Sequence, residues 1–202
     1  GTSIIESGID FNNTGIIDVN SGTLNVGTIN NNGIVNVNKG DFIAGSLIDT
    51  NGVFNLAEDR KLVINGGHST DTVFNLSKNS TTSLSSSING TLKLNGEEAN
   101  FNATNLTVVN GESASIKGNV KNFHITGKLG AEDGNLSLDL DKDNIIKLSG
   151  GSVGGAGTTT NKNKFEWHSG SIVGSGGLTN ESNNFKIMGD ERKSISTIIK
   201  QN

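Results

Sequence analysis

One phrase of the sequence decides the fold: Gly33-Ile34-Val35-Asn36-Val37-Asn38. From Val35 onward, apolar and polar residues alternate, which is the pattern of a strand with one buried and one exposed face. Asn and Gly, which favour turns, flank the phrase in Asn31-Asn32 and Lys39-Gly40. The phrase therefore predicts a short, half-buried β-strand between two turns.

Similar phrases recur along the chain, with starts at positions 15, 33, 52, 72 and 90 and separations of 18, 19, 20 and 18 residues. The other four copies are Gly15-Ile16-Ile17-Asp18-Val19-Asn20, Gly52-Val53-Phe54-Asn55-Leu56, Thr72-Val73-Phe74-Asn75-Leu76 and Gly90-Thr91-Leu92-Lys93-Leu94-Asn95. Self-similarity at a fixed period is typical of repeat architectures.

A second phrase follows the first two copies, so each period contains at least two strands. Its copies are Ser21-Gly22-Thr23-Leu24-Asn25-Val26 and Lys39-Gly40-Asp41-Phe42-Ile43-Ala44. Three further copies near the C-terminus start 20 residues apart, at Asn144, Lys164 and Asn184. Residues 96–143 are less regular, which predicts longer turns and not a domain boundary.

Strand alternation sorts the copies into an inner and an outer column. We expect inward side chains at Ile17/Val19, Val35/Val37, Phe54/Leu56, Phe74/Leu76 and Leu92/Leu94. The expected outer column is Asp18, Asn36, Asn55, Asn75 and Lys93.

These patterns predict an all-β fold, a right-handed parallel β-helix (solenoid) with coils of about 20 residues, which forms one domain over residues 1–202. A β-sandwich also has many short strands, but its strands need not resemble one another at a fixed spacing. The segment 191–200 can form a final strand, a cap or a helix. We expect Ser3-Ile4-Ile5 and Ile198-Ile199 to pair with further coils of a larger protein or to be capped, because open strand edges aggregate.

The composition suits such a one-dimensional core. Only 32% of the residues are hydrophobic, while Gly accounts for 28 positions and Pro and Cys for none. The net charge of −4, without a basic cluster, argues against a nucleic-acid partner. No apolar run approaches a membrane span, so contact with a membrane is expected only through other parts of a larger protein.

Three stretches are similar to the repeats of bacterial exported surface proteins, namely autotransporter passengers and filamentous haemagglutinin-like adhesins. The stretches are Asn31-Asn32-Gly33-Ile34-Val35-Asn36-Val37, Ser21-Gly22-Thr23-Leu24-Asn25-Val26 and Trp167-His168-Ser169-Gly170-Ser171-Ile172-Val173-Gly174-Ser175-Gly176. The resemblance implies a fragment of a larger exported protein, an extracellular or cell-surface location and a structural or adhesive role. The implied partners are host or neighbouring cell-surface molecules, either glycans or proteins.

An alternative from another class is a polysaccharide-binding or polysaccharide-degrading β-helix, including phage tailspike-like proteins. An enzyme of this kind needs clustered carboxylates on one outer sheet. The acidic pairs Glu58-Asp59 and Glu97-Glu98 are expected to be solvated. A tail fibre would form an obligate trimer, so solution mass separates that hypothesis from a monomeric segment.

No constellation in the sequence predicts catalysis, so we expect a non-enzyme without catalytic residues, cofactor or metal site. Asp139, Asp141 and Asp143 begin like a calcium loop, but Asn144 and Gly150 stand where Gly and a bidentate Glu are needed. A polar strand end and turn is the favoured interpretation, and calcium binding is left open. The three histidines, His68, His124 and His168, are expected in different coils with structural or exposed roles, and Trp167 is expected to point inward beside Phe165.

Overall fold

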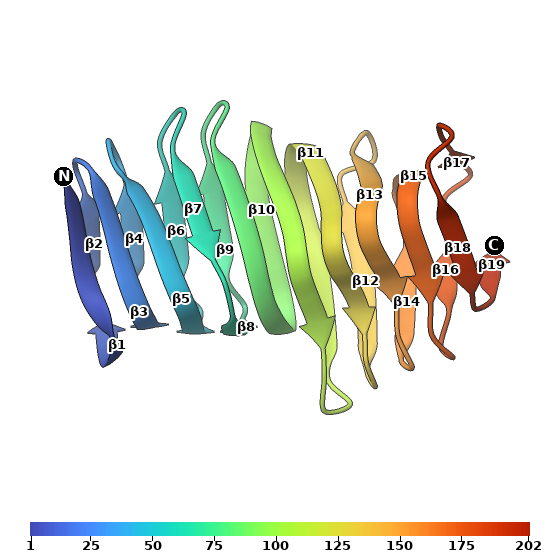
Figure 1. Ribbon diagram of the computed structural model, residues 1–202, viewed down its shortest axis with the longest axis horizontal. Helices are drawn as coiled ribbons and strands as arrows, with labels where there is room; N and C mark the ends of the chain where they lie inside the picture. Colours follow the sequence, from blue (N-terminus) through green and yellow to red (C-terminus); the bar gives the residue numbers. More distant parts are fainter.

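The repeated phrases form strands that stack in parallel, each paired with its copy in the next coil. Ile34 pairs with Val53, and Val53 pairs with Val73. The computed structural model describes the backbone of residues 1–202 and all side chains except those of residues 5–8. Figure 1 shows one straight rod of successive coils, with the N-terminus at one end and the C-terminus at the other. The predicted all-β parallel β-helix is therefore confirmed, with about ten coils about 20 residues apart.

The pairings divide the rod into three faces, which each coil visits in the same order. The first face carries the recurring phrase and continues through the shorter strands of the C-terminal half. Its separate strands are β2 (Ile16–Val19), β4 (Ile34–Val37), β6 (Val53–Leu56), β9 (Val73–Leu76), β12 (Asn135–Leu140), β14 (Thr158–Asn161), β16 (Leu178–Asn180) and β19 (Ile199–Gln201).

Most strands of the second face turn a corner and continue on the third face. In β5 the buried residues Ala44 and Leu47 are three positions apart, so the alternation is interrupted there and the strand bends. Strands that turn this corner are β1 (Thr2–Asn13), β3 (Thr23–Asn31), β5 (Asp41–Thr50), β13 (Ile145–Gly154) and β15 (Lys164–Val173).

The remaining strands complete the second and third faces. β7 (Lys61–Ile64) and β17 (Phe185–Ile187) lie on the second face, and β8 (Gly67–Thr70) and β18 (Lys193–Ser196) lie on the third. Two long strands, β10 (Thr81–Val108) and β11 (Ser113–Ala131), run over all three faces. The less regular region 96–143 is thus part of the same rod, and segment 191–200 contributes β18 and the start of β19.

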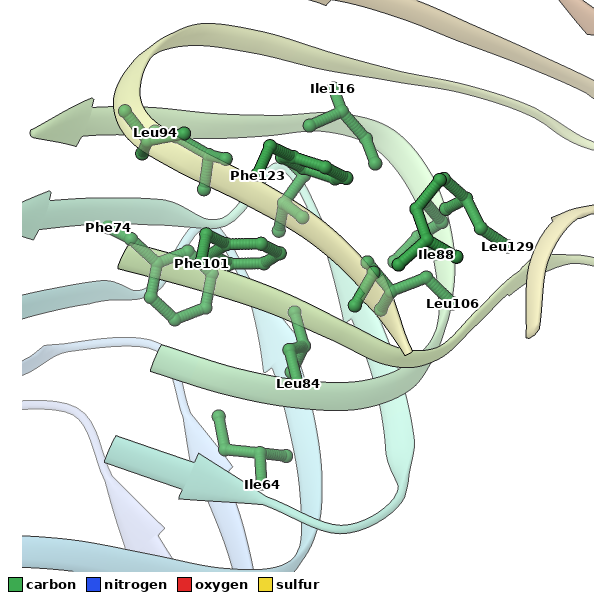
Figure 2. Packing of buried hydrophobic residues seen from close by; sticks show 14 of the residues in the cluster. Ile64, Phe74, Leu84, Ile88, Leu94, Phe101, Leu106, Ile116, Phe123 and Leu129 are labelled. Atoms are coloured by element: carbon green, nitrogen blue, oxygen red, sulfur yellow. The ribbon is translucent and has the colours of Figure 1, made fainter. Parts of the chain in front are cut away.

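Aliphatic and aromatic side chains from all three faces fill the interior. The predicted inward residues Val35, Val37, Phe54, Phe74, Leu92 and Leu94 are all buried. Phe54 stacks on Phe74 with ring centroids 5.3 Å apart. Figure 2 shows Phe74, Phe101 and Phe123 packed among leucine and isoleucine side chains of neighbouring coils. The core is a column of side chains along the rod axis, which explains how a modest apolar fraction suffices.

An amide ladder follows the outer surface of the first face. The Nδ2 of Asn36 donates to Oδ1 of Asp18 at 2.8 Å, and Asn55, Asn75 and Asn95 continue the series at 2.8, 2.7 and 2.8 Å. The prediction that Lys93 continues this column is wrong. Asn95 pairs with Asn75, and Lys93 pairs with Val73, because the fifth copy enters the face two residues earlier and keeps the amide bond in line.

Asn55→Ala is expected to lower the free energy of unfolding by about 0.5–1 kcal/mol. The substitution removes one bond that Asn55 donates to Asn36 and one that it accepts from Asn75, and both are partly exposed to water. Thermal or urea unfolding measures the loss. Asn105→Ala is the matched control, because Asn105 is an exposed asparagine in β10 outside this ladder, and it should change stability less.

The C-terminal copies also pair in a different register from the predicted one. A spacing of 20 aligns Asn144 with Lys164, whereas the structure pairs Ile145 with Lys164 and Lys147 with Glu166. Asn144 is instead buried at the preceding corner, where its side chain bonds to Asn119 and to the amide of Val120. Filling that corner shifts the strand by one residue. The next copy does follow at 20 residues, since Phe165 pairs with Phe185.

Candidate functional site

Ionisable side chains of neighbouring coils lie side by side on the second face. His124 pairs with Lys147, Lys147 with Glu166, and Glu166 with Lys186. Each lies between inward residues such as Phe165 and Trp167, so alternation points it outward. We call His124, Lys147, Glu166 and His168 the polar row. Its register follows from parallel stacking, which places like positions of successive coils side by side.

The polar row contains one close polar contact and one perturbed imidazole. Nε2 of His168 lies 3.2 Å from Oε2 of Glu166. Burial lowers the pKa of His124 below its usual value, and electrostatic interactions with Lys147 and His168 lower it further. His124 is therefore neutral at pH 7 and can both donate and accept hydrogen bonds. The row offers an imidazole, an ammonium group and a carboxylate along a half-buried surface.

This arrangement suits binding better than hydrolysis. Glycoside hydrolysis ordinarily needs two carboxylates on either side of the scissile bond. The polar row contains one, Glu166, and His168 already contacts it. His124 and His168 lie in different coils, as expected, but the spacings along the chain bring both to the same face. Uneven coil lengths hid that convergence in the sequence.

His68 lies on the third face and is held by two hydroxyl groups. Its Nδ1 is 2.9 Å from Oγ of Ser87, and its Nε2 is 3.1 Å from Oγ1 of Thr70. A hydrolytic triad requires a carboxylate to orient the imidazole, and both ring nitrogens of His68 face hydroxyls instead. The geometry fits a structural contact between coils.

The three aspartates of the calcium-like segment do not converge. Nζ of Lys162 lies 3.5 Å from Oδ2 of Asp139, and Nζ of Lys164 lies 3.3 Å from Oδ1 of Asp143. Asp141 is exposed at the turn. Two lysines of the next coil thus occupy the places beside the carboxylates where a cation would bind. Among the described side chains, no group of three His, Cys, Asp or Glu residues could hold a metal ion.

Calcium is accordingly expected to leave the melting temperature unchanged. The ammonium groups of Lys162 and Lys164 repel a divalent cation, and the carboxylates lack the multidentate geometry that calcium requires. Melting curves recorded with millimolar calcium and with a chelator measure the effect. Stabilisation by calcium that disappears in Asp139→Asn would contradict this prediction.

Other acidic residues and the aromatic candidate lie as the sequence predicts. Glu58, Asp59, Glu97 and Glu98 are exposed, and Trp167 is buried with 1% of its surface accessible. A hollow of about 330 Å³ lies at the N-terminal end of the rod, beside Asp18, Val19 and Leu24. It is the open end of the interior column and not a cleft in a face.

Sequence reasoning missed the buried polar groups at the corners. Asn13, Asn31 and Asp49 follow one another at the end of the third face, and all three are buried. Asn161, Asn163 and Asn180 form a second buried set, in which Nδ2 of Asn161 donates to Oδ1 of Asn180 at 2.6 Å. The signal that could have found them is the recurrence of Asn at the ends of strand phrases.

Comparisons with protein-family models, with curated protein sequences and with solved structures find no match to the chain. The functional argument therefore rests on the residues and their geometry. Within the described residues, no helix is long and apolar enough to span a membrane.

Proposed function

We propose that this chain is a stalk-like structural segment of a secreted or surface-displayed bacterial protein, which holds other parts of that protein at a distance. The observation that supports the proposal is the continuous one-dimensional core. Every coil packs on its neighbours through matched residues such as Phe54 and Phe74, so the rod resists bending and its length grows with the number of coils. The outer amide ladder reinforces this stacking on the first face.

The described surface supports a spacer more than an enzyme. Asp139 and Asp143 pair with lysines, Glu166 contacts His168, and the acidic pairs Glu58-Asp59 and Glu97-Glu98 are exposed. The absence of cysteine agrees with an exported protein that needs no disulfide framework. The similarity of the repeats to those of bacterial exported surface proteins motivates the proposed location at the cell surface. The same similarity motivates adhesion as an additional role of the rod.

Removing whole coils tests the spacer function. Residues 34–72 form two coils whose deletion joins Gly33 to Val73, and Val73 would take over the pairing of Ile34 through the same register. The chain and its deletion variant are each placed between a membrane anchor and a fluorescent reporter on a laboratory bacterium. The deletion should bring the reporter about 10 Å closer to the membrane, from a strand spacing of about 4.8 Å per coil.

Two outcomes of that experiment are informative. A shift proportional to the number of coils removed supports a rigid spacer. An unchanged reporter height, with circular dichroism showing that both variants remain folded, would show that the rod does not project and would contradict the proposal.

A second candidate function is polysaccharide binding through the polar row. The observation that favours it is the row itself, which aligns hydrogen-bonding groups of His124, Lys147 and Glu166 on successive coils. Binding to a glycan array, compared between the natural chain and Lys147→Ala, tests it. Lys121→Ala is the control, since Lys121 is also exposed but lies outside the row.

A further inference from the structure

Two lysines lie opposite each other in the middle of the rod. Lys93 of β10 pairs with Lys117 of β11 on the first face. Figure 1 shows these two strands in the central part of the rod, with further coils on either side. Both side chains are exposed and point outward, because they alternate with the buried residues Leu92, Leu94 and Ile116. Among the described strand pairings, no other register pair joins two residues of like charge.

Within the described part of the chain, the ammonium groups of this pair have no acidic partner. Asp139 pairs with Lys117 in the next coil, but its Oδ2 lies 3.5 Å from Nζ of Lys162. On the other side, Lys93 pairs with Val73. Paired strands are about 4.8 Å apart, and like charges opposite each other at that spacing destabilise a sheet. The stability of the fold therefore does not account for the pair.

Hydroxyl groups lie beside the two lysines on the same outer surface. Thr91 and Ser115 precede the lysines by two residues, and their hydroxyl oxygens are 3.3 Å apart. We call Thr91, Lys93, Ser115 and Lys117 the lysine patch. The hydroxyl column continues over the next three coils, at Ser137, Thr160 and Thr179, and all of its members are partly exposed. Because a hydroxyl group both donates and accepts hydrogen bonds, the first face offers a line of such groups beside two positive charges.

The charges of the lysine patch fit a phosphate group better than other anions. A phosphate monoester carries a charge of about −1.5 to −2 at pH 7 and three acceptor oxygens. One such group can therefore compensate both ammonium groups and also accept a hydrogen bond from a hydroxyl. A carboxylate or a sulfate ester carries a single negative charge and leaves the pair half compensated. Lysine binds phosphate as a point charge, whereas bidentate recognition of carboxylates favours arginine.

The surroundings of the lysine patch fit a polysaccharide better than a nucleic acid. A nucleic acid needs a longer basic stripe, whereas the next coil presents Asp139 in contact with Lys162 and the chain has a net charge of −4. A sugar chain presents hydroxyl groups along its length. The column from Thr91 to Thr179 likewise presents one hydroxyl group per coil along the rod axis. The two lines of hydroxyl groups can therefore exchange hydrogen bonds beside the charged pair.

We propose that the lysine patch binds a phosphate monoester of a polysaccharide, with the sugar chain lying along the hydroxyl column of the first face. The phosphate oxygens accept hydrogen bonds from Nζ of Lys93 and of Lys117, and the sugar hydroxyls bond to the column. This binding goes beyond the spacer function, because it uses the side of the rod and does not depend on the length of the rod. It also differs from the second candidate function, because the polar row lies on the second face.

Biolayer interferometry tests the proposal with three immobilised polymers that share one backbone, namely phosphorylated, sulfated and unmodified dextran. The natural chain should bind phosphorylated dextran most tightly, with an affinity that falls as salt is added, and should not bind unmodified dextran. Lys93→Gln with Lys117→Gln should bind phosphorylated dextran at least about fivefold more weakly, because two exposed charge contacts are lost. Lys93→Glu with Lys117→Glu should abolish binding, because attraction becomes repulsion.

The control removes the same two charges elsewhere. Lys61→Gln with Lys121→Gln neutralises two exposed lysines outside the lysine patch and should bind as the natural chain does, and circular dichroism checks that every variant folds. Without ligand, Lys117→Gln should melt at an unchanged or higher temperature, because it removes a repulsion. A lower melting temperature assigns the lysine to the stability of the fold and overturns the proposal. Equal losses in the test and control variants, no binding to phosphorylated dextran, or tighter binding to sulfated dextran overturn it as well.

Discussion

Phe74→Ala is expected to lower the free energy of unfolding by about 3–5 kcal/mol, the range for removing a buried phenyl ring. Phe74 has no accessible surface. Its ring stacks on Phe54 at 5.3 Å and meets Phe101 edge-on at 6.1 Å. Because a coil contacts only its neighbours, no distant side chain can move in to fill the space. The backbone cannot collapse either, since β9 is paired on both sides.

Urea unfolding measures the loss, and hydrogen exchange locates it. Amides of β6 and β9 should exchange faster in Phe74→Ala, because β9 contains the substitution and β6 pairs with it. Amides of β15 should change little, because each coil contacts only its neighbours and β15 lies several coils away. Phe185→Ala provides a matched control: this ring stacks on one neighbour only and is partly exposed, so it should cost less than half as much. Equal losses at both positions would contradict the idea of a one-dimensional core.

The architecture could be predicted because the apolar residues that specify it recur at regular intervals along the sequence. Val35, Phe54 and Phe74 recur at nearly constant spacing, and alternation alone assigns them to the interior. Local propensity, spacing and burial all agree there, which is the condition under which sequence reasoning succeeds. The same alternation predicts that Trp167 points inward beside Phe165, and both side chains are buried.

The predicted strand register is wrong where a coil changes length. Matching the phrase that starts at Gly90 assigns Lys93 to the outer column, and a spacing of 20 aligns Asn144 with Lys164. The structure instead places Asn95 in the amide ladder and Asn144 in a corner, and each makes a side-chain hydrogen bond there. The convergence of His124 and Glu166 on one face depends on the same uneven lengths, so the polar row could not be predicted either.

The buried corner residues were missed for a different reason. Asn31 and Asp49 look like turn residues in the sequence, where exposure is the ordinary expectation for polar side chains. In the structure they point inward, and Nδ2 of Asn13 donates to Oδ1 of Asn31 at 2.7 Å. Stacking turns an isolated polar residue into a member of a column, where neighbours satisfy part of its hydrogen bonding.

Asp49→Asn is expected to stabilise the protein by about 1–3 kcal/mol above pH 7 and to have little effect near pH 4. Asp49 is the one carboxylate in a buried column of asparagines, with 1% of its surface accessible. Burial raises the pKa of Asp49 from 3.8 to about 6, although the Gly52 amide, which donates to Oδ1 at 2.6 Å, favours the charged form. The side chains of Thr72 and Asn31 also favour the charged form, but burial outweighs all three interactions.

The sign of the pH dependence follows from that direction. A group whose folded pKa is raised stabilises the fold fully below its unfolded pKa, and this contribution is lost as pH rises through the folded value. For Asp49 this stabilisation is lost as the pH rises from about 4 to about 7. Asparagine has no charge to bury and keeps an oxygen for the Gly52 amide, so the variant should show no such loss.

Urea unfolding of the natural chain and of Asp49→Asn at pH 4 and pH 8 measures the difference. Asp18→Asn is the matched control, because Asp18 also lies in one column with asparagines but is exposed, so its charge is not buried. The natural chain and Asp49→Asn should have similar free energies of unfolding at pH 4. At pH 8 the free energy of unfolding of Asp49→Asn should be the higher of the two. Destabilisation of Asp49→Asn at both pH values would show instead that the corner needs a carboxyl group, and that its burial is compensated by contacts that an amide cannot make.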